Sequence, residues 1–184
     1  GRLILTGANL VDGEHPAKPN STVVVEGNRI TSVGPAGPET TPEDRVVALN
    51  GKTVMPGMYS CHFHSAYHNM GAAPGAARMP LGLEHSATYY ALLAADNAKR
   101  CLMSGFTGAA GASTIYDVDM SLKAAIDRGI VPGPRLLASS RDIVTTGDSP
   151  DARPWFWGAT TDGATLIADG PDEFRKAVRS EIKR

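Results

Sequence analysis

The sequence is poor in the features that mark several large classes of protein. Its 184 residues include two cysteines, Cys61 and Cys101, too few for a disulfide scaffold, so we expect reduced, buried thiols. No run of about 18 apolar residues occurs, which excludes a membrane-spanning helix. Eighteen basic residues stand against 19 acidic ones, so charge gives no reason to expect binding to nucleic acid or to an anionic membrane. What remains is ordinary globular composition, with 42% hydrophobic and 20% charged residues.

Residues 1–55 have the pattern of short β-strands joined by tight turns. Apolar and polar residues alternate in several of these runs, which is typical of strands with one buried face. Two pairs of runs flank a dipeptide of asparagine and glycine, a strong hairpin signal. The two hairpins are predicted over 22–33, around Gly27-Asn28, and over 45–55, around Asn50-Gly51. We therefore expect a small antiparallel β-sandwich module in this part of the chain.

After Pro56 the pattern changes to alternating strands and helices. Strands are predicted over 58–65, 106–113 and 134–139, helices over 87–102, around 122–126 and over 171–182, and loops over 66–84 and 145–168. Repeated β/α units predict a parallel sheet, which is either doubly wound or part of a barrel. The 128 residues from Gly57 to Arg184 have room for three units, whereas a complete (β/α)8 barrel takes about 250 residues.

The strongest chemical motif is the pair His62 and His64, near the end of the first predicted strand of this second part. Side chains alternate along a strand, so both imidazoles lie on one face, with Cys61 and Phe63 on the other. Two imidazoles roughly 7 Å apart at the backbone can converge on one divalent ion. Such a pair is equally compatible with two ordinary surface or core histidines. The carboxyl end of a parallel strand is where α/β enzymes place their sites.

The order of motifs resembles the amidohydrolase superfamily of metal-dependent hydrolases. Met55-Pro56-Gly57 before His-x-His is similar to the entry of the family's first barrel strand, and 105–107 to the entry of the second. Residues 124–136 and 169–179 resemble elements of the branch that includes imidazolonepropionase and the Xaa-Pro and Xaa-Arg dipeptidases. The resemblance implies an α/β fold: the N-terminal part of a (β/α)8 TIM-type barrel over 56–184, preceded by the β-sandwich module, with the barrel incomplete in this chain.

The resemblance also implies a chemistry, in which a metal-activated water attacks an amide-type carbonyl. His62 and His64 match the family's first-strand metal ligands. The bridging carboxylated lysine, the further histidines and the catalytic aspartate belong to later strands, so we assign no catalytic residue here and expect these groups beyond residue 184. Lys183 lies on a predicted helix and is not assigned the bridging role. We expect one or two divalent ions, with zinc first, although imidazole also suits iron, nickel or copper.

Two positions depart from the family pattern, and four residues are candidates for substrate binding. Ser60 stands where the family has aspartate, and 145–148 lacks the histidine that relatives carry in this loop. Both departures are compatible with an altered substrate pocket or metal count. The substrate-binding candidates are His68, Arg141, Trp155 and Trp157. An arginine can hold a substrate carboxylate and the tryptophans can line an apolar pocket, although all four are also explained as surface or loop-packing residues.

The leading hypothesis is a metal-dependent hydrolase that cleaves an amide-type C–N bond, in a peptide or acyl-amino acid or in an aryl amide, urea or carbamate. The alternative is a non-catalytic barrel fragment or binding scaffold that has lost the chemistry. A doubly wound nucleotide-binding domain ranks third, because no Gly-x-Gly-x-x-Gly follows the first strand.

The expected partners follow from the same hypothesis. A three-unit piece of barrel exposes an unpaired parallel strand, so a second chain or a further segment is expected to complete the barrel. We also expect a small-molecule or dipeptide-like substrate, a homo-oligomer, a cytoplasmic location, and neither nucleic acid nor membrane as a partner.

Overall fold

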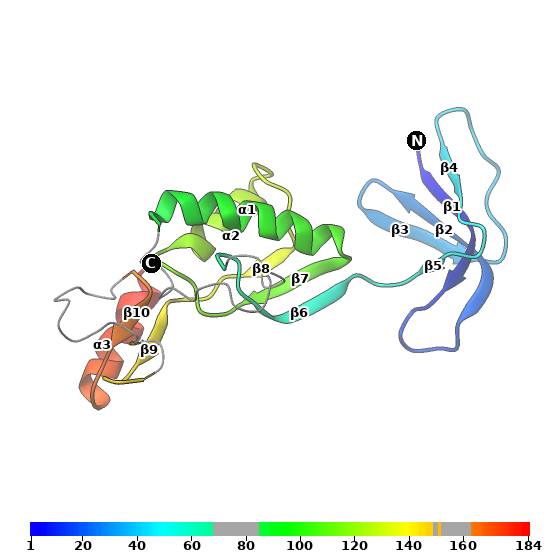
Figure 1. Ribbon diagram of the computed structural model, residues 1–184. Helices are drawn as coiled ribbons and strands as arrows, with labels where there is room; N and C mark the ends of the chain where they lie inside the picture. Colours follow the sequence, from blue (N-terminus) through cyan, green and yellow to red (C-terminus); the bar gives the residue numbers. More distant parts are fainter. Residues whose placement is uncertain (68–84, 149–150, 152–162) are drawn as a thin grey trace, which may run out of the picture. The chain divides into compact units, whose positions relative to one another are not determined.

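A computed structural model of the chain describes residues 1–67, 85–148, 151 and 163–184. The chain divides into two compact units, Gly1–Pro56 and Gly57–Arg184. The first unit contains strands alone, whereas all helices of the described residues belong to the second (Figure 1).

The N-terminal unit is a five-stranded mixed sheet in the order β3-β2-β1-β4, with β5 also paired to β1. Its strands are β1 (Leu3–Leu10), β2 (Lys18–Glu26), β3 (Arg29–Gly34), β4 (Arg45–Ala48) and β5 (Thr53–Val54). β2 and β3 are antiparallel, and Glu26 lies opposite Arg29 across the turn. The first predicted hairpin is thereby confirmed.

The second predicted hairpin is wrong. β4 and β5 do not pair with each other; both run parallel to β1, at different positions along it. Asn50 and Gly51 do form a turn, with φ angles of 50° and 81°, and the amide of Gly51 donates to the carbonyl of Gly7 at 2.8 Å. The chain then continues in its original direction, because β1 pairs with both segments and fixes their direction. The expectation of an entirely antiparallel module is wrong for the same reason.

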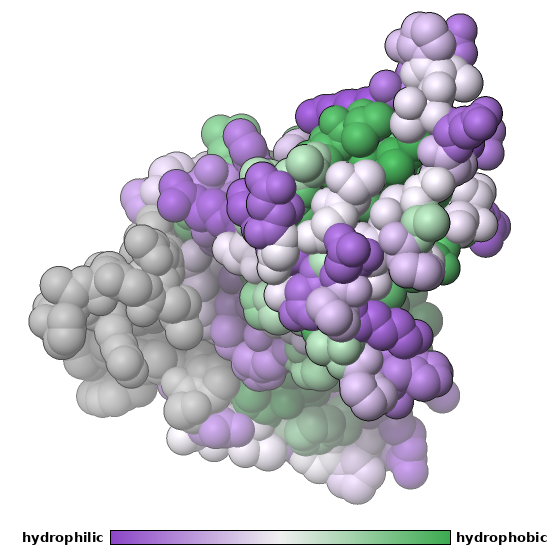
Figure 2. Space-filling model, turned by 90° about the vertical axis from the view of Figure 1, so that its right-hand side faces the viewer, coloured by the Kyte–Doolittle hydropathy of each residue, from purple (hydrophilic) through white to green (hydrophobic). Residues whose placement is uncertain are grey.

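Apolar residues of the N-terminal sheet are buried at its centre and exposed on its outer strands. Ile4, Val23 and Val24 are buried, whereas Ile30 and Val46 are 66% and 50% exposed. Figure 2, which faces this unit, shows hydrophobic surface in green between hydrophilic residues. This distribution is typical of one layer of a larger β structure. The described residues of this N-terminal unit form a single sheet, so the sandwich stays a prediction.

The C-terminal unit contains the predicted parallel sheet. The strands β6 (Met58–Phe63), β7 (Phe106–Gly111) and β8 (Arg135–Leu137) are neighbours in that order and all parallel. Helices α1 (Ala87–Met103) and α2 (Val118–Asp127) connect them and contact β7 and β8 respectively. The repeated β/α arrangement is therefore confirmed, and the sheet is not closed into a barrel among the described residues.

A second, short sheet follows, which the sequence did not predict. β9 (Asp142–Val144) and β10 (Thr165–Ile167) pair in parallel before helix α3 (Pro171–Ile182). The interpretation of 145–168 as loop throughout is therefore wrong at β10. Strands of three residues are too short to show an alternating pattern. Helix α3 begins as predicted, with proline and two acidic residues in its first turn.

The packing of α1 determines which face of β6 is available for a site. Tyr90, Ala94 and Ala98 of α1 are fully buried against residues of β7, α2 and β8, and Phe63 packs onto this cluster. Phe63 thus faces the helices, and its neighbours His62 and His64 face the other side of the sheet. The small alanine side chains let α1 lie close to the strands.

The cysteines differ from the prediction of two buried thiols. Cys61 is exposed, because β6 is an edge strand of the described sheet. Cys101 is partly buried, and this burial raises the pKa of its thiol. In the described parts of the chain, no helix has the length and apolar character that crossing a membrane requires.

Candidate metal centre

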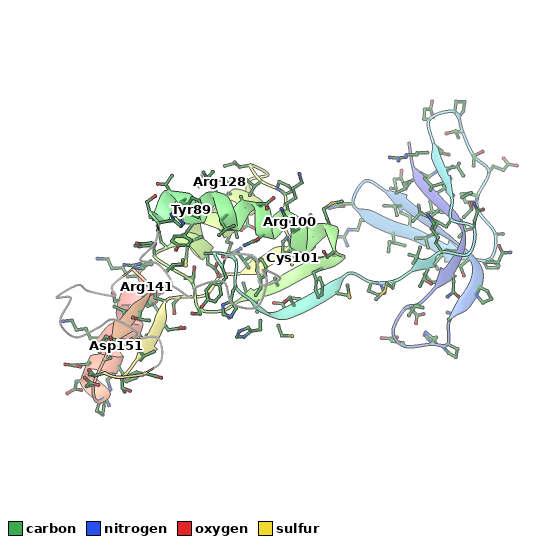
Figure 3. All side chains as sticks on the ribbon, in the orientation of Figure 1. Tyr89, Arg100, Cys101, Arg128, Arg141 and Asp151 are labelled. Atoms are coloured by element: carbon green, nitrogen blue, oxygen red, sulfur yellow. The ribbon has the colours of Figure 1, made fainter. Side chains whose placement is uncertain are left out.

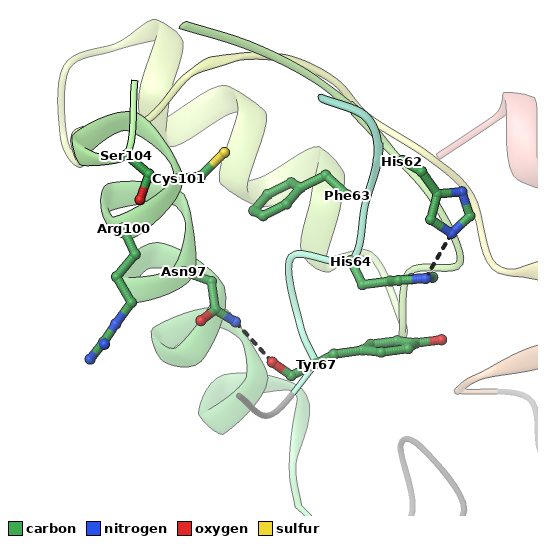
Figure 4. Close-up of a pocket in the computed structure, with 8 residues that line it drawn as sticks. All are labelled: His62, Phe63, His64, Tyr67, Asn97, Arg100, Cys101 and Ser104. Atoms are coloured by element: carbon green, nitrogen blue, oxygen red, sulfur yellow. Dashed lines mark hydrogen bonds between the residues drawn. The ribbon is translucent and has the colours of Figure 1, made fainter. Parts of the chain in front are cut away.

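The rings of His62 and His64 meet at the carboxyl end of β6 (Figure 4). Their Nε2 atoms are 2.9 Å apart, and the rings are nearly perpendicular, with centroids 4.6 Å apart. Alternation along the strand predicts this shared face. Both side chains are accessible enough to receive a further ligand, because neither histidine is buried.

The spacing of the two nitrogens fits a metal ion. With Zn–N bonds of about 2.0–2.1 Å, two ligands at a tetrahedral ion are about 3.3 Å apart, and two at a right angle about 2.9 Å. A small rotation of either ring would bring the distance between the two Nε2 atoms to any value in this range of about 2.9–3.3 Å. Among residues 1–67, 85–148, 151 and 163–184, no cluster of three or more His, Cys, Asp or Glu side chains could hold a metal ion. The described residues thus provide two ligands, and a complete site needs others.

The backbone of β7 determines the tautomer of His64. Its Nδ1 lies 2.7 Å from the carbonyl oxygen of Ala112, just beyond the end of β7. A carbonyl only accepts, so Nδ1 carries the proton and the lone pair of the neutral ring is on Nε2. Metal-binding histidines are commonly fixed in this way. His64 therefore directs its unprotonated Nε2 at His62 Nε2, with which it is hydrogen-bonded.

Aromatic and amide side chains surround His64. Tyr67 stacks on its ring, with centroids 4.0 Å apart and an angle of 10° between the planes. The amide of Asn97, on α1, donates to the backbone oxygens of Ser65 and Tyr67 at 2.8 and 2.9 Å. Partial burial raises the pKa of Tyr67, so its hydroxyl stays protonated at neutral pH. The two hydrogen bonds of Asn97 attach the segment after β6 to helix α1.

A buried aspartate connects the segments that follow the three parallel strands. Asp119 of α2 is 1% exposed and accepts from the hydroxyl of Ser65, next to His64. Its other oxygen accepts from the amide and hydroxyl of Ser139 at 3.1 and 3.0 Å. The Asp119 amide lies 3.3 Å from Thr114 Oγ1, to which it donates. The carboxylate thus contacts residues that follow β6 and β8, and the backbone amide of the same residue contacts one that follows β7.

The two histidines line a cavity of about 500 Å³ between α1 and the end of β6. Figure 4 shows the eight lining residues: His62, Phe63, His64, Tyr67, Asn97, Arg100, Cys101 and Ser104. The cavity lies on the Phe63 and α1 side of β6, whereas the two imidazole rings point to the other side (Figure 4).

The other predicted site residues lie elsewhere or outside the described residues. His68, Trp155 and Trp157 are outside the described residues. Arg141 (Figure 3) is buried and forms an ion pair of 2.6 Å with Glu181 of α3, so its contact with substrate stays a prediction. Ser60 is one of the two positions that depart from the family pattern. Its hydroxyl lies 3.4 Å from the backbone oxygen of His62.

Sequence reasoning missed the residues that support the histidines, namely Tyr67, Asn97, Ser113, Asp119 and Asp142. A signal was present, because Ser65, Ser113 and Ser139 are the last residues of the three predicted strands, and the carboxyl ends of parallel strands lie at one edge. Nothing in the local pattern shows that a helical aspartate contacts two of these ends.

Several known proteins are similar to this chain. No family model matches. Ochratoxinase of Aspergillus niger is 25% identical over 204 aligned positions, which cover 98% of this chain and 40% of ochratoxinase. A prolidase complexed with N-methylphosphonate-L-proline is 29% identical with a TM-score of 0.77, and the match covers 100% of this chain and 44% of the prolidase. A Xaa-Pro dipeptidase with methionine bound in its active site is 26% identical, with a TM-score of 0.77 and coverage of 100% and 45%.

The fold, the histidine pair and these similarities define the class of the protein. The chain belongs to the amidohydrolase superfamily, as the order of its motifs indicates. Within that superfamily it is related to prolidases, that is Xaa-Pro dipeptidases, and to ochratoxinase. It spans 40% to 45% of the length of these relatives, and the matched part is the mixed α/β portion described above.

Proposed function

We propose that the protein is a metal-dependent hydrolase of an amide-type C–N bond, to which this chain contributes His62 and His64 as metal ligands. The observation that carries the proposal is the 2.9 Å approach of the two Nε2 atoms, with the Nδ1 of His64 bonded to a backbone oxygen. A bound divalent ion, with zinc as the first candidate, would polarise the substrate carbonyl and acidify a water. The two histidines bind, and the Ala112 carbonyl orients one of them.

The substrate that we propose is a dipeptide or an N-acyl amino acid, with an aryl amide, urea or carbamate as the second candidate. Support comes from the relatives named prolidase and Xaa-Pro dipeptidase, one of them complexed with N-methylphosphonate-L-proline. The residues proposed to contact the substrate are His68, Arg141, Trp155 and Trp157. For Arg141 this requires release from Glu181, which holds its guanidinium in the described structure.

We further propose that another polypeptide segment, from the same protein or a second chain, completes the barrel and the site. In the part of the chain that the structure describes, β6 and β8 each have one paired neighbour, β7, and Leu137 of β8 is exposed. Strands of a parallel sheet are normally paired and covered. The added segment would supply the bridging lysine, further histidines and catalytic aspartate. A homo-oligomer is one way to supply it.

A substrate panel tests the proposal. The assembled protein is assayed with Xaa-Pro dipeptides, N-acyl amino acids, aryl amides, ureas and carbamates, before and after the changes His62→Ala and His64→Ala. We expect hydrolysis of at least one class, and a decrease of kcat/KM of more than about 100-fold in both variants. His85→Ala is the matched control, because the ring of His85 contacts that of Tyr89 and His85 does not line the cavity. Equal activity of the two site variants and this control would refute the assignment.

A non-catalytic scaffold is the alternative, and Ser60 is the observation that favours it. Where the family has a carboxylate, this chain has a hydroxyl 3.4 Å from a backbone oxygen of His62, so support of the metal ligands differs. A protein that binds the metal ion through both histidines but hydrolyses none of the substrate classes would favour the scaffold.

A further inference from the structure

Tyr67 is the aromatic residue in closest parallel contact with a proposed metal ligand. Its ring covers one face of His64 at a centroid distance of 4.0 Å, and the planes differ by 10°. Figure 4 shows the two rings one above the other, while the His62 ring meets the edge of His64. The stacking restricts the tilt of the imidazole plane, and the Ala112 hydrogen bond restricts its rotation within that plane.

Tyr67 is itself held by hydrogen bonds at its backbone oxygen and at its side-chain hydroxyl. Asn97 donates to its backbone oxygen. At the other end, the hydroxyl of Tyr67 donates to Ser113 Oγ at 3.0 Å, and Ser113 Oγ donates to Asp142 Oδ2 at 2.6 Å. The path thus runs from the segment after β6, across the segment after β7, to the first residue of β9. Three separate elements are needed to hold this one ring.

The backbone at Ser113 indicates that this path is not incidental. Ser113 has a φ of 50°, in the left-handed region that residues other than glycine rarely adopt. Such conformations persist where surrounding contacts require them, and they concentrate at functional sites. At Ser113 these contacts are the two hydrogen bonds of its hydroxyl.

We propose that Tyr67 is a positioning residue of the metal centre: held by Ser113 and Asp142, it fixes the plane of His64 so that Nε2 points at the metal position. The inference rests on the proposed function, because it assigns a ligand role to His64. It makes the two histidines unequal. His64 has a ring that is stacked and hydrogen-bonded at Nδ1, whereas among the described residues the ring of His62 contacts His64 alone.

Metal affinity provides the first test. The dissociation constant for Zn²⁺ is measured in the assembled protein for Tyr67→Leu, which removes the stacked ring, and for Tyr67→Phe, which removes the hydroxyl alone. Outer contacts of metal ligands are worth about 10- to 100-fold in affinity, so we expect that range for leucine and a smaller loss for phenylalanine. Tyr89→Leu is the matched control, since the ring of Tyr89 on α1 contacts that of His85 at the same centroid distance of 4.0 Å, with 34° between the planes. Equal affinity of Tyr67→Leu and Tyr89→Leu would overturn the proposal.

A double-mutant cycle tests the connection through Ser113. Ser113→Gly removes the hydroxyl and suits the positive φ, so this variant keeps its fold even where Tyr67→Leu does not. Tyr67→Phe and Ser113→Gly remove the same hydrogen bond from opposite ends, and Ser113→Gly also removes the bond to Asp142. The double variant should therefore bind Zn²⁺ no more weakly than the weaker of the two single variants. Additive losses from the two changes would refute the connection.

A readout in the metal-free protein separates this inference from the proposed function. The ¹⁵N shifts of His64 report its tautomer, which should be protonated at Nδ1 in the unaltered protein. Without the stacked ring of Tyr67 the imidazole should tilt away from the Ala112 carbonyl, so that in Tyr67→Leu the proton is shared between the two nitrogens. An unchanged tautomer in a folded Tyr67→Leu variant would overturn the positioning role, whether or not the protein binds metal. Failure of the unaltered protein to bind Zn²⁺, with the tautomer effect intact, would instead refute the proposed function.

Discussion

Replacing Asp119 should loosen the segments that follow β6 and β8 in the C-terminal unit. The side chain is 1% exposed and accepts three hydrogen bonds, from the hydroxyl of Ser65 and from the amide and hydroxyl of Ser139. Asp119→Ala removes the acceptor and leaves these donors facing a buried space. Asp119→Asn keeps the shape, and one amide oxygen can still accept from Ser139.

The expected magnitude follows from these bonds. A hydrogen bond to a charged group is worth about 1.5–3 kcal/mol, and an unsatisfied buried donor costs about 1–3 kcal/mol. Because water can enter the space left by the carboxylate and the terms are not additive, we expect Asp119→Ala to lower the free energy of unfolding by about 3–5 kcal/mol. Asp119→Asn should cost about half as much, because it loses the charge and one acceptor position.

Gly111 provides an internal check of this reasoning. A Cβ at Gly111 would lie 2.0 Å from Oδ2 of Asp119 and 2.9 Å from the amide of Ser139. Gly111→Ala should therefore destabilise the protein, and by less when Asp119 is already alanine. Urea unfolding followed by circular dichroism at 222 nm, to which α1, α2 and α3 contribute, measures all four states of the cycle. A loss below about 1 kcal/mol for Asp119→Ala, or strict additivity with Gly111→Ala, would refute the assigned role.

Three further predictions concern the ion pair of Arg141 and the contacts of Asn97. Glu181→Ala leaves a buried guanidinium without its carboxylate and should cost about 3–5 kcal/mol in urea unfolding, whereas Arg141→Met with Glu181→Leu should cost less; a larger loss in the double variant would be contrary to this. Burial raises the pKa of Glu181. The hydrogen bonds and the charge of Arg141 lower it by more than burial raises it, so the pKa in the folded protein is below the ordinary 4.5. The stability that the pair contributes should therefore be present above pH 4.5 and lost as the pH falls through the lower folded-state pKa; pH-dependent unfolding that is the same in Arg141→Met would contradict this. Asn97→Ala removes two hydrogen bonds to backbone oxygens and should cost about 1–3 kcal/mol in the same assay, with weaker Zn²⁺ binding; unchanged affinity would separate Asn97 from the metal centre.

The fold could be predicted where the determining interactions are local in the sequence. The turn at Gly27-Asn28 joins two strands that pair with each other, so the local pattern was sufficient. Asn50-Gly51 has the same composition and also forms a turn, but the strands on either side pair with β1 instead. That partner lies some forty residues away in the sequence, and no local signal identifies it.

The candidate site shows the same division. Alternation along one strand brings His62 and His64 to the same face. The relative direction of two side chains on one strand follows from the strand geometry alone, so the local sequence is sufficient to predict it. The support of His64 comes from the ring of Tyr67 and the carbonyl of Ala112. Ala112 lies 48 residues further along the chain, and Tyr67 is held in part by Asn97 of α1. Arg141 was predicted from its side-chain chemistry alone, and the structure pairs it with Glu181, a residue of the last helix.

The most direct test of the account is the metal content of the assembled protein and of its His64→Ala variant, measured by elemental analysis after loading with Zn²⁺ and dialysis. His85→Ala serves as control. We expect one or two equivalents of metal in the unaltered protein and in the control, and the loss of at least one equivalent in His64→Ala. Equal metal content in all three proteins would show that His64 is not a ligand and would contradict the central claim.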